Sequence, residues 1–333
     1  MPSTLKFNRN YKKILIVCPA GAISGGPEAL HQLASHMNSL GLKAYMCYLP
    51  FTHKSLTPQS YERYMTQTSP YEDSRDNLII FPEVFPMLAL NVKYAQVGLW
   101  WLSLDNFLER RYVSSFYDKI RYFKRVIQGR RPWGGAQALK KLLHFSQTEH
   151  SSLYLRSFGI EPTPLIDSIN EDFLTKRYLD RIEEKQDLIL YNPTKGWKVT
   201  YKIIEAFPNW KFEPIKGLDR DQLTEKLFQA KLYIDFGHHP GRDRLPREAA
   251  MHGCCIISGK LGSASNDIDL PIPSQYKIDS NSPRFIKRFE EITSQILENF
   301  PSHYAQFNSY REWLMEEPQI FRKQIENFFF DNN

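Results

Sequence analysis

One stretch of the chain, residues 235–250, concentrates side chains that could bind an anion or exchange protons with a ligand. It contains two histidines and three arginines, namely His238, His239, Arg242, Arg244 and Arg247. Arginine forks match the geometry of a phosphate, so we expect an anion site that uses one or more of the three arginines. The adjacent histidines could bind a metal, but no third ligand stands at a recognised spacing. This stretch therefore predicts a phosphate-binding loop without a metal.

Three glycine-containing loops also follow predicted strands and could receive an anion. They contain Gly25 and Gly26, Lys195 and Gly196, and Gly262 and Ser263. In open α/β sheets ligands bind beyond the carboxyl ends of the strands, where helix N-termini attract anions. A lysine in such a loop can neutralise a phosphate as a point charge. The sequence has neither the dinucleotide fingerprint G-x-G-x-x-G nor a P-loop, so these loops predict a cleft for another kind of phosphorylated ligand.

Short apolar runs that alternate with helical patterns must position these loops. The predicted strands are residues 14–18, 43–49, 78–81, 97–102 and 143–145, followed later by 187–191, 211–215, 231–236 and 254–258. The predicted helices are residues 27–40, 200–207, 221–230, 246–252 and 310–330. Short apolar strands separated by helices indicate parallel sheets that are covered on both faces. The predicted fold class is α/β, with two Rossmann-like domains facing across a cleft.

The length of 333 residues fits two domains. A charged stretch at 161–185, broken by two prolines, suits the boundary between them. We predict an N-terminal Rossmann-like domain at 1–167 and a C-terminal one at 168–305. The remaining segment, 306–333, is helical in composition and is expected to pack back across the interface onto the first domain.

The composition is that of an ordinary folded protein, with 42% apolar and 24% charged residues. No apolar run approaches the roughly 20 residues of a spanning helix. The four cysteines, Cys18, Cys47, Cys254 and Cys255, form no C-x-x-C motif, so we expect buried reduced thiols. Pro19 interrupts the first apolar run too early for a signal peptide, which predicts a cytoplasmic protein.

The net charge of +6 is concentrated in one segment. Residues 109–131 carry eight lysines and arginines against two carboxylates, which accounts for the whole excess. Aromatic and aliphatic residues recur there at helical spacing. The segment is either a helix with a solvated basic face or a basic amphipathic patch that binds anionic lipid on the inner face of the cell membrane. So local an excess gives no reason to expect nucleic acid as a partner.

From these residues the sequence resembles the GT-B glycosyltransferases, and in particular the branch related to glycosyltransferase family 4. The resemblance covers residues 24–41 and 190–279. It implies that Gly25 and Gly26 open the first helix at the ligand site and that Lys195 and Gly196 bind the diphosphate of a nucleotide-sugar donor. It also implies further donor contacts from Glu248, on the ribose, and from Gly262 and Ser263, near the phosphates.

The sequence departs from the family pattern at two points. The family pattern has two glutamates separated by seven residues, and Pro240 stands eight positions before Glu248. The family's sugar contacts and retaining outcome are therefore not carried over. The arginine usually found shortly before the Lys-Gly pair is also missing, and Arg242 or Arg244 could replace its phosphate contact. His238 is a further candidate donor contact. UDP, GDP and CMP all remain open as the donor nucleotide, CMP because His239-Pro240 resembles the His-Pro pair of sialyltransferase-like enzymes.

The resemblance implies a metal-independent enzyme with no cofactor, which moves a sugar from a nucleotide-sugar to a glycan or lipid-linked acceptor in surface polysaccharide biosynthesis. The two Asp-x-Asp triplets, 219–221 and 267–269, are interpreted as structural. If the reaction inverts, Glu83 or Asp105 could deprotonate the acceptor, because each follows a predicted strand of the first domain. The alternatives are a non-catalytic nucleotide-binding protein and an NAD-dependent oxidoreductase with two Rossmann-like domains.

Overall fold

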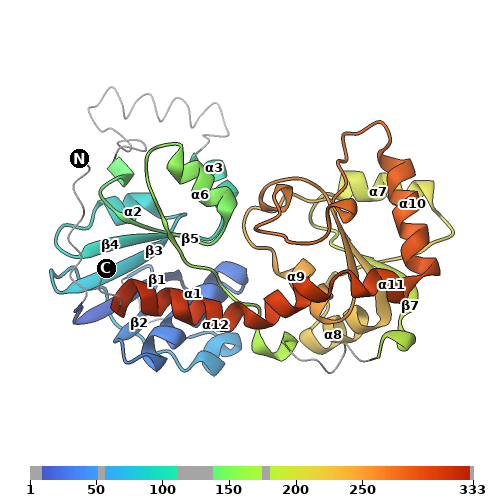
Figure 1. Ribbon diagram of the computed structural model, residues 1–333. Coiled ribbons are helices and arrows are strands. Elements are labelled where there is room, and N and C mark those ends of the chain that lie inside the picture. The colour runs from blue at the N-terminus through green and yellow to red at the C-terminus, as the bar shows by residue number, and fades with distance from the viewer. Residues whose placement is uncertain (1–9, 52–56, 112–137, 175–180, 331–333) are drawn as a thin grey trace. The chain divides into compact units, whose positions relative to one another are not determined.

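The computed structural model describes residues 10–51, 57–111, 138–174 and 181–330. It divides into two compact units (Figure 1). The first comprises residues 1–167 and 319–333, and the second comprises residues 168–318. Each unit contains one parallel sheet, as the sequence predicts. Of the basic segment 109–131, residues 112–131 and the side chains of 109–111 lie outside the described part of the chain.

The first unit contains a six-stranded parallel sheet with the order β2-β1-β3-β4-β5-β6. The strands are β1 (Lys13–Pro19), β2 (Ala44–Leu49), β3 (Asn77–Pro82), β4 (Gln96–Trp101), β5 (Leu143–Ser146) and β6 (Thr163–Pro164). The five strands predicted in this part are confirmed to within one residue at each end. The two-residue β6 was not predicted, because its length gives no periodicity to read.

Helices cover both faces of this sheet. Side chains of each strand alternate between the two faces, and each face belongs to a buried cluster. Along β1, Ile14 and Ile16 belong to one cluster and Leu15 and Val17 to the other. The first cluster is covered by α1 (Gly25–Ser39) and by the last part of α12 (Asn308–Phe330). Helices α2 (Pro86–Leu90), α3 (Leu104–Arg111) and α6 (Glu149–Arg156) contribute to the second.

Helix α1 begins at Gly25, two residues earlier than predicted. Pro27 is therefore its third residue and not its first. Proline is tolerated there because the first turn of a helix has no intrahelical acceptor for its N–H groups. At the other end, Gly41 adopts a positive φ of 82° just after the helix, which confirms the predicted glycine cap.

The second unit contains a four-stranded parallel sheet with the order β10-β9-β7-β8. The strands are β7 (Gln186–Tyr191), β8 (Lys211–Pro214), β9 (Ala230–Asp235) and β10 (Cys255–Ser258). The helices are α7 (Trp197–Ala206), α8 (Arg220–Gln229), α9 (Arg244–Met251), α10 (Phe285–Glu298) and α11 (Phe300–Ala305). Among the described residues, the short 3₁₀ turns are η1 (Gln59–Tyr64) in the first unit and η2 (Glu171–Phe173), η4 (Ile182–Glu184), η5 (Ser263–Ser265) and η6 (Ser274–Tyr276) in the second. All four strands were predicted, but α7 begins three residues earlier than expected, and α10 and α11 were missed.

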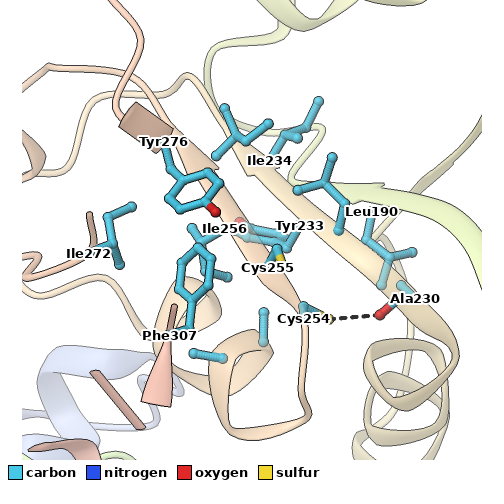
Figure 2. Packing of buried hydrophobic residues seen from close by; sticks show 14 of the residues in the cluster. Leu190, Ala230, Tyr233, Ile234, Cys254, Cys255, Ile256, Ile272, Tyr276 and Phe307 are labelled. Atoms are coloured by element: carbon cyan, nitrogen blue, oxygen red, sulfur yellow. Dashed lines mark hydrogen bonds between the residues drawn. The ribbon is translucent and has the colours of Figure 1, made fainter. Parts of the chain in front are cut away.

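The core of the second unit forms around β9 and β10 (Figure 2). Tyr233 and Ile256 lie at its centre, and Cys254 and Cys255 are buried beside them. The thiol of Cys254 donates to the Ala230 carbonyl at 3.3 Å. All four cysteines are free and buried, which confirms the predicted buried thiols. Among the helices of the described residues, none combines the length and hydropathy needed to cross a bilayer.

A buried ion cluster fastens α12 to α9 within the second unit. The Glu317 carboxylate on α12 contacts Arg242 and lies 3.0 Å from Nη1 of Arg247. It also accepts the backbone N–H of Ile169 at 3.3 Å. The guanidinium of Arg242 in turn lies over the Trp313 ring, 4.6 Å from its centroid. One carboxylate therefore fixes two buried cations and the chain that enters the unit.

Replacement of Glu317 should destabilise the protein strongly, because it leaves two buried guanidinium groups without their counter-ion. We expect Glu317→Gln to lower the free energy of unfolding by about 3 kcal/mol. Urea unfolding measures this, with Glu312→Gln, at an exposed position on the same helix, as the matched control. Equal stability of the two variants would show that the cluster does not hold α12.

Candidate functional site

Three loops of the second unit meet because their strands are neighbours. Strand β9 lies between β7 and β10, and all three strands run in the same direction. Tyr191 at the end of β7 pairs with Ile234, and Ser258 at the end of β10 pairs with Asp235. The segments that follow these strands therefore leave the same edge of the sheet, which is where α/β proteins bind ligands.

Glycine is required where these loops touch. Gly196 has a φ of 59°, and a Cβ atom there would lie 2.5 Å from the backbone N of Gly237. Gly262 has a φ of 63°, and its Cβ would lie 2.1 Å from the carbonyl oxygen of His239. Backbone lies directly on backbone at both points, so a larger residue would force the loops apart.

Hydrogen bonds fix the loop after β10 against the loop after β9. The backbone N–H of Ser263 donates to the carbonyl of His239 at 2.9 Å, and its hydroxyl donates to the carbonyl of Gly241 at 2.6 Å. The structure thus brings together four of the predicted site residues, namely Lys195, Gly196, Gly262 and Ser263. It adds the segment 237–243 as the element between them.

A chain of alternating charges runs through this meeting point. The ammonium of Lys195 contacts the carboxylate of Asp243, the N-cap residue of α9. Nδ1 of His239 lies 3.6 Å from the same carboxylate, and Nε2 lies 3.6 Å from Oδ1 of Asp235. The imidazole is buried between two carboxylates, and one of these carboxylates is shared with the lysine.

This arrangement favours the charged form of the histidine. Burial opposes the imidazolium, but the facing carboxylates, Asp235 above all, outweigh burial and raise the pKa of His239. Burial also opposes ionisation of Asp235, yet His239 and the Lys195 charge outweigh it and lower the pKa of Asp235. The carboxylate of Asp235 further accepts the hydroxyl of Tyr233 at 3.0 Å and the N–H of Gly237 at 2.8 Å. Such satisfied groups keep their charges in a buried site.

The ligand atoms of Asp235, His239 and Asp243 lie within 4.8 Å of one another, close enough to suggest a metal. A metal would need the lone pair of one imidazole nitrogen, whereas here each nitrogen faces a different carboxylate. The ammonium of Lys195 already holds Asp243. We therefore interpret the three residues as a charge network and not as a metal site.

The two Asp-x-Asp triplets are used locally. Asp219 caps α8 by accepting the N–H of Gln222 at 2.9 Å, and the Gln222 side chain bonds back to Asp219, a complete capping box. Asp267 forms a 2.8 Å ion pair with Lys277, and Asp269 accepts the Asn266 amide at 2.8 Å. These contacts agree with the structural interpretation of both triplets.

The other predicted donor contacts of this unit have different surroundings. His238 is exposed beside the loop after β10, and Arg244 is the half-buried first residue of α9. Glu248 is buried on α9, one turn further along. Arg242 is turned toward Glu317 and Trp313, so its charge serves the ion cluster described above. Lys195 lies where the three loops meet, and its ammonium is paired with Asp243; Arg244 follows close by in sequence.

In the first unit, the predicted residues also follow the strands of the sheet. Gly25 and Gly26 are the first residues of α1, directly beyond β1. Glu83 follows β3; it is buried, and its carboxylate accepts the N–H of Leu102 at 3.0 Å. It therefore joins the segments that follow β3 and β4. Such a contact is what a structural carboxylate makes.

Asp105 lies in the first turn of α3, after β4, and faces a histidine that sequence reasoning missed. Nε2 of His150 is 3.7 Å from Oδ2 of Asp105. His150 is the second residue of α6, which follows β5, and Thr148 caps that helix by accepting the N–H of Ser151 at 3.0 Å. The side chains are 28% exposed for His150 and 19% exposed for Asp105, and the two atoms that face each other are buried.

Comparison with known proteins supports the fold alone. No protein-family profile and no curated protein sequence matches the chain. Its fold is similar to that of an α-glucosyltransferase in complex with UDP and a 13-mer DNA, at a TM-score of 0.58 and 11% identity, covering 96% of this chain and 99% of that one. It is also similar to that of sucrose-phosphate synthase from Thermosynechococcus elongatus, at a TM-score of 0.65 and 10% identity, covering 95% of this chain and 98% of that one. The structure of TarM matches at a TM-score of 0.52 and 16% identity, covering 78% of this chain and 56% of that one. The chain therefore has the predicted α/β fold class with parallel sheets, as GT-B glycosyltransferases do.

Proposed function

We propose that the protein is a GT-B glycosyltransferase related to family 4, which takes a sugar from a nucleotide-sugar donor without a metal or other cofactor. The observation that carries the proposal is the position of Lys195, next to Gly196, at the carboxyl edge of the second sheet. The loops after β7, β9 and β10 meet there. Residues 168–305 would then be the donor domain and residues 1–167 the acceptor-side domain. Several of the similar structures are glycosyltransferases with bound UDP, which favours UDP as the nucleotide.

The chemistry of glycosyl transfer explains why a cation is needed at this edge. As the bond to the sugar breaks, negative charge grows on the departing diphosphate. Without a metal, that charge must be met by Lys195 and by the free N–H groups at the N-terminus of α7, which begins at Trp197. Gly262 and Ser263 would bring further backbone close to the phosphates, and Glu248 would hold the ribose.

Loss of the Lys195 charge should weaken nucleotide binding. We expect Lys195→Met to weaken UDP binding by at least about 100-fold in titration calorimetry with EDTA present, because a charge-assisted contact to phosphate is lost. Lys202→Met, at an exposed position on α7, is the matched control and should bind as the wild type does.

Two results would contradict the proposal. Tight UDP, GDP or CMP binding by Lys195→Met would remove the lysine from the donor site. Binding that EDTA abolishes and Mg²⁺ restores would show that the protein uses a metal.

The first unit offers the base that an inverting transfer would need. Asp105 and Glu83 are the two predicted candidates, and Asp105 is favoured because its carboxylate faces His150. A neighbouring imidazole can hold such a carboxylate in place while the carboxylate takes the proton from an acceptor hydroxyl. Glu83 is engaged by the backbone of Leu102 and is the weaker candidate.

Asp105→Asn should therefore lower turnover by about 100-fold or more and leave the dissociation constant of UDP unchanged. Radiolabelled sugar transfer and titration calorimetry measure the two quantities. Asp76→Asn, at an exposed position in the same unit, is the control, and Glu83→Gln tests the second candidate. A variant with full turnover eliminates the residue concerned as a base.

The acceptor is proposed to be a glycan or lipid-linked glycan in surface polysaccharide biosynthesis. The notion of a lipid-linked acceptor rests on the basic segment 109–131, whose eight cations would hold a cytoplasmic enzyme on the anionic inner face of the membrane. One similar structure contains DNA, so an oligonucleotide belongs among the acceptors assayed, although we expect none to be used.

Membrane association has a direct test in vesicle co-sedimentation. We expect the protein to bind vesicles containing phosphatidylserine at low salt, and the triple variant Arg121→Gln, Lys124→Gln, Arg125→Gln to bind at least about tenfold more weakly, at about 1 kcal/mol per charge. Equal binding by wild type and variant, unaffected by salt, would contradict this role of the segment.

The alternative functions are a non-catalytic nucleotide-binding protein and an NAD-dependent oxidoreductase. The G-x-G-x-x-G fingerprint is absent between β1 and α1, where the sequence runs through Gly25 and Gly26 instead. A thermal shift with NAD alone, and none with UDP, GDP or CMP, would favour the oxidoreductase. UDP binding with neither sugar transfer to any acceptor nor hydrolysis of UDP-sugars would favour the non-catalytic protein.

A further inference from the structure

The ammonium of Lys195 is already engaged in this structure. It contacts the carboxylate of Asp243, which is only 15% exposed. A diphosphate that binds Lys195 must therefore displace this carboxylate or share the lysine with it. A carboxylate left without a counter-ion in so buried a place would cost free energy, and that cost would weaken the binding of the diphosphate.

A second cation is positioned to prevent that cost. Nδ1 of His239 lies 3.6 Å from the same Asp243 carboxylate, on the loop between β9 and α9. The backbone of His239 is fixed by its bonds to Leu261 at 3.3 Å and Ser263 at 2.9 Å. The imidazole therefore stays beside Asp243 when the flexible lysine side chain moves.

We propose that Asp243 is the resident counter-ion of Lys195 and that His239, in its protonated form, takes over Asp243 when a nucleoside diphosphate takes the lysine. This inference rests on the proposed function of Lys195 and adds to it two positioning residues, His239 and Asp243. Neither residue needs to touch the donor. Their role is to release the lysine at little cost.

The charges around the imidazole support this exchange. On β9, Asp235 faces the imidazole and also accepts the Tyr233 hydroxyl. At the N-terminus of α9, Asp243 faces the other imidazole nitrogen. The charge of Lys195, in the loop after β7, also acts on the imidazole. The contacts from the loop after β10 are backbone ones, at the carbonyl and N–H of His239. Two cations and two anions thus balance in the free protein, and the proton on His239 maintains that balance.

The exchange predicts the direction of a pH effect. In the free protein the lysine charge works to lower the pKa of His239, while the two carboxylates raise it. When the lysine leaves Asp243 for a diphosphate, the histidine faces a more negative surrounding and its pKa rises further. The bound state then holds the proton more tightly than the free state does. The affinity for the diphosphate is constant below the pKa that His239 has in the free protein. It falls as pH rises above that pKa, by at most about tenfold per pH unit for one proton.

Titration calorimetry with UDP between pH 7.5 and 9.5 tests this, because the phosphate protons of UDP, with a pKa of about 6, are already lost there. Wild-type affinity should fall as pH rises across the range, by at most about tenfold per pH unit. Proton uptake on binding, measured directly in two buffers of different ionisation enthalpy, should be positive and largest between the pKa of His239 in the free protein and its higher pKa in the complex. That measurement needs no variant, so it holds even if a substitution at a buried residue impairs folding.

Two variants separate the roles of the pair. His239→Gln should bind UDP more weakly than wild type at pH 7.5 and should show no pH dependence, because its Asp243 is left unbalanced at every pH. Asp243→Asn removes the competing carboxylate, so it should bind UDP about fivefold more tightly than wild type at pH 9, again without pH dependence.

The matched controls are His303→Gln and Glu213→Gln. His303 has a pKa lowered by burial, so it does not titrate in this range, and Glu213 forms a comparable pair with Lys226 at 2.6 Å. Both should keep the wild-type pH profile. The inference would be overturned by a wild-type affinity that does not depend on pH, or by a His239→Gln profile like that of the wild type. The proposed function would still stand in either case if UDP binding depends on Lys195. Failure of UDP, GDP and CMP to bind at all would overturn both.

Discussion

The direct contact between backbones at Gly196 is the constraint on which the site depends. The loop after β7 approaches the loop after β9 so closely that a Cβ atom would lie 2.5 Å from the next backbone. Gly262 imposes the same approach between the loops after β9 and β10. Because the three strands are parallel neighbours, these contacts bring Lys195, His239 and Ser263 to one place. A looser sheet edge would separate the lysine from its partners.

Charge balance is the second principle of the second unit, and it is applied twice. At the strand ends, two cations alternate with two carboxylates, from Lys195 through Asp243 and His239 to Asp235. Further along the chain, Glu317 on α12 neutralises Arg242, which precedes α9, and Arg247 on α9. The first network contains a flexible lysine and lies in loops, which suits exchange with a ligand. The second is fully buried and bridges helices, which suits stability.

Much of the fold follows from the sequence because it depends on local patterns. Buried parallel strands are short continuous apolar runs, so the strands from Ile14 to Ser258 could be placed to within about a residue. The glycines at 196 and 262 were also found, since a positive φ or a close approach selects glycine strongly. Helix starts were less certain, as at α1 and α7, because several polar residues can serve there.

The pairing of charges could not be read from the sequence. Lys195 and Asp243 are 48 residues apart, and Arg242 meets Glu317 across 75 residues. Three arginines near a helix start look alike in sequence, and only the fold shows that Arg242 is turned into the ion cluster. His150 was missed for the same reason, since its partner Asp105 lies on another helix. The one signal available was its position just after a predicted strand, which is also where Asp105 stands.

A crystal structure of the protein with bound UDP tests the account most directly. The account predicts that the diphosphate lies within hydrogen-bond distance of Nζ of Lys195, at the edge formed by the loops after β7, β9 and β10. It also predicts that Asp243 has lost the lysine and kept His239. A nucleotide bound elsewhere, or a diphosphate with Lys195 still on Asp243, would contradict it.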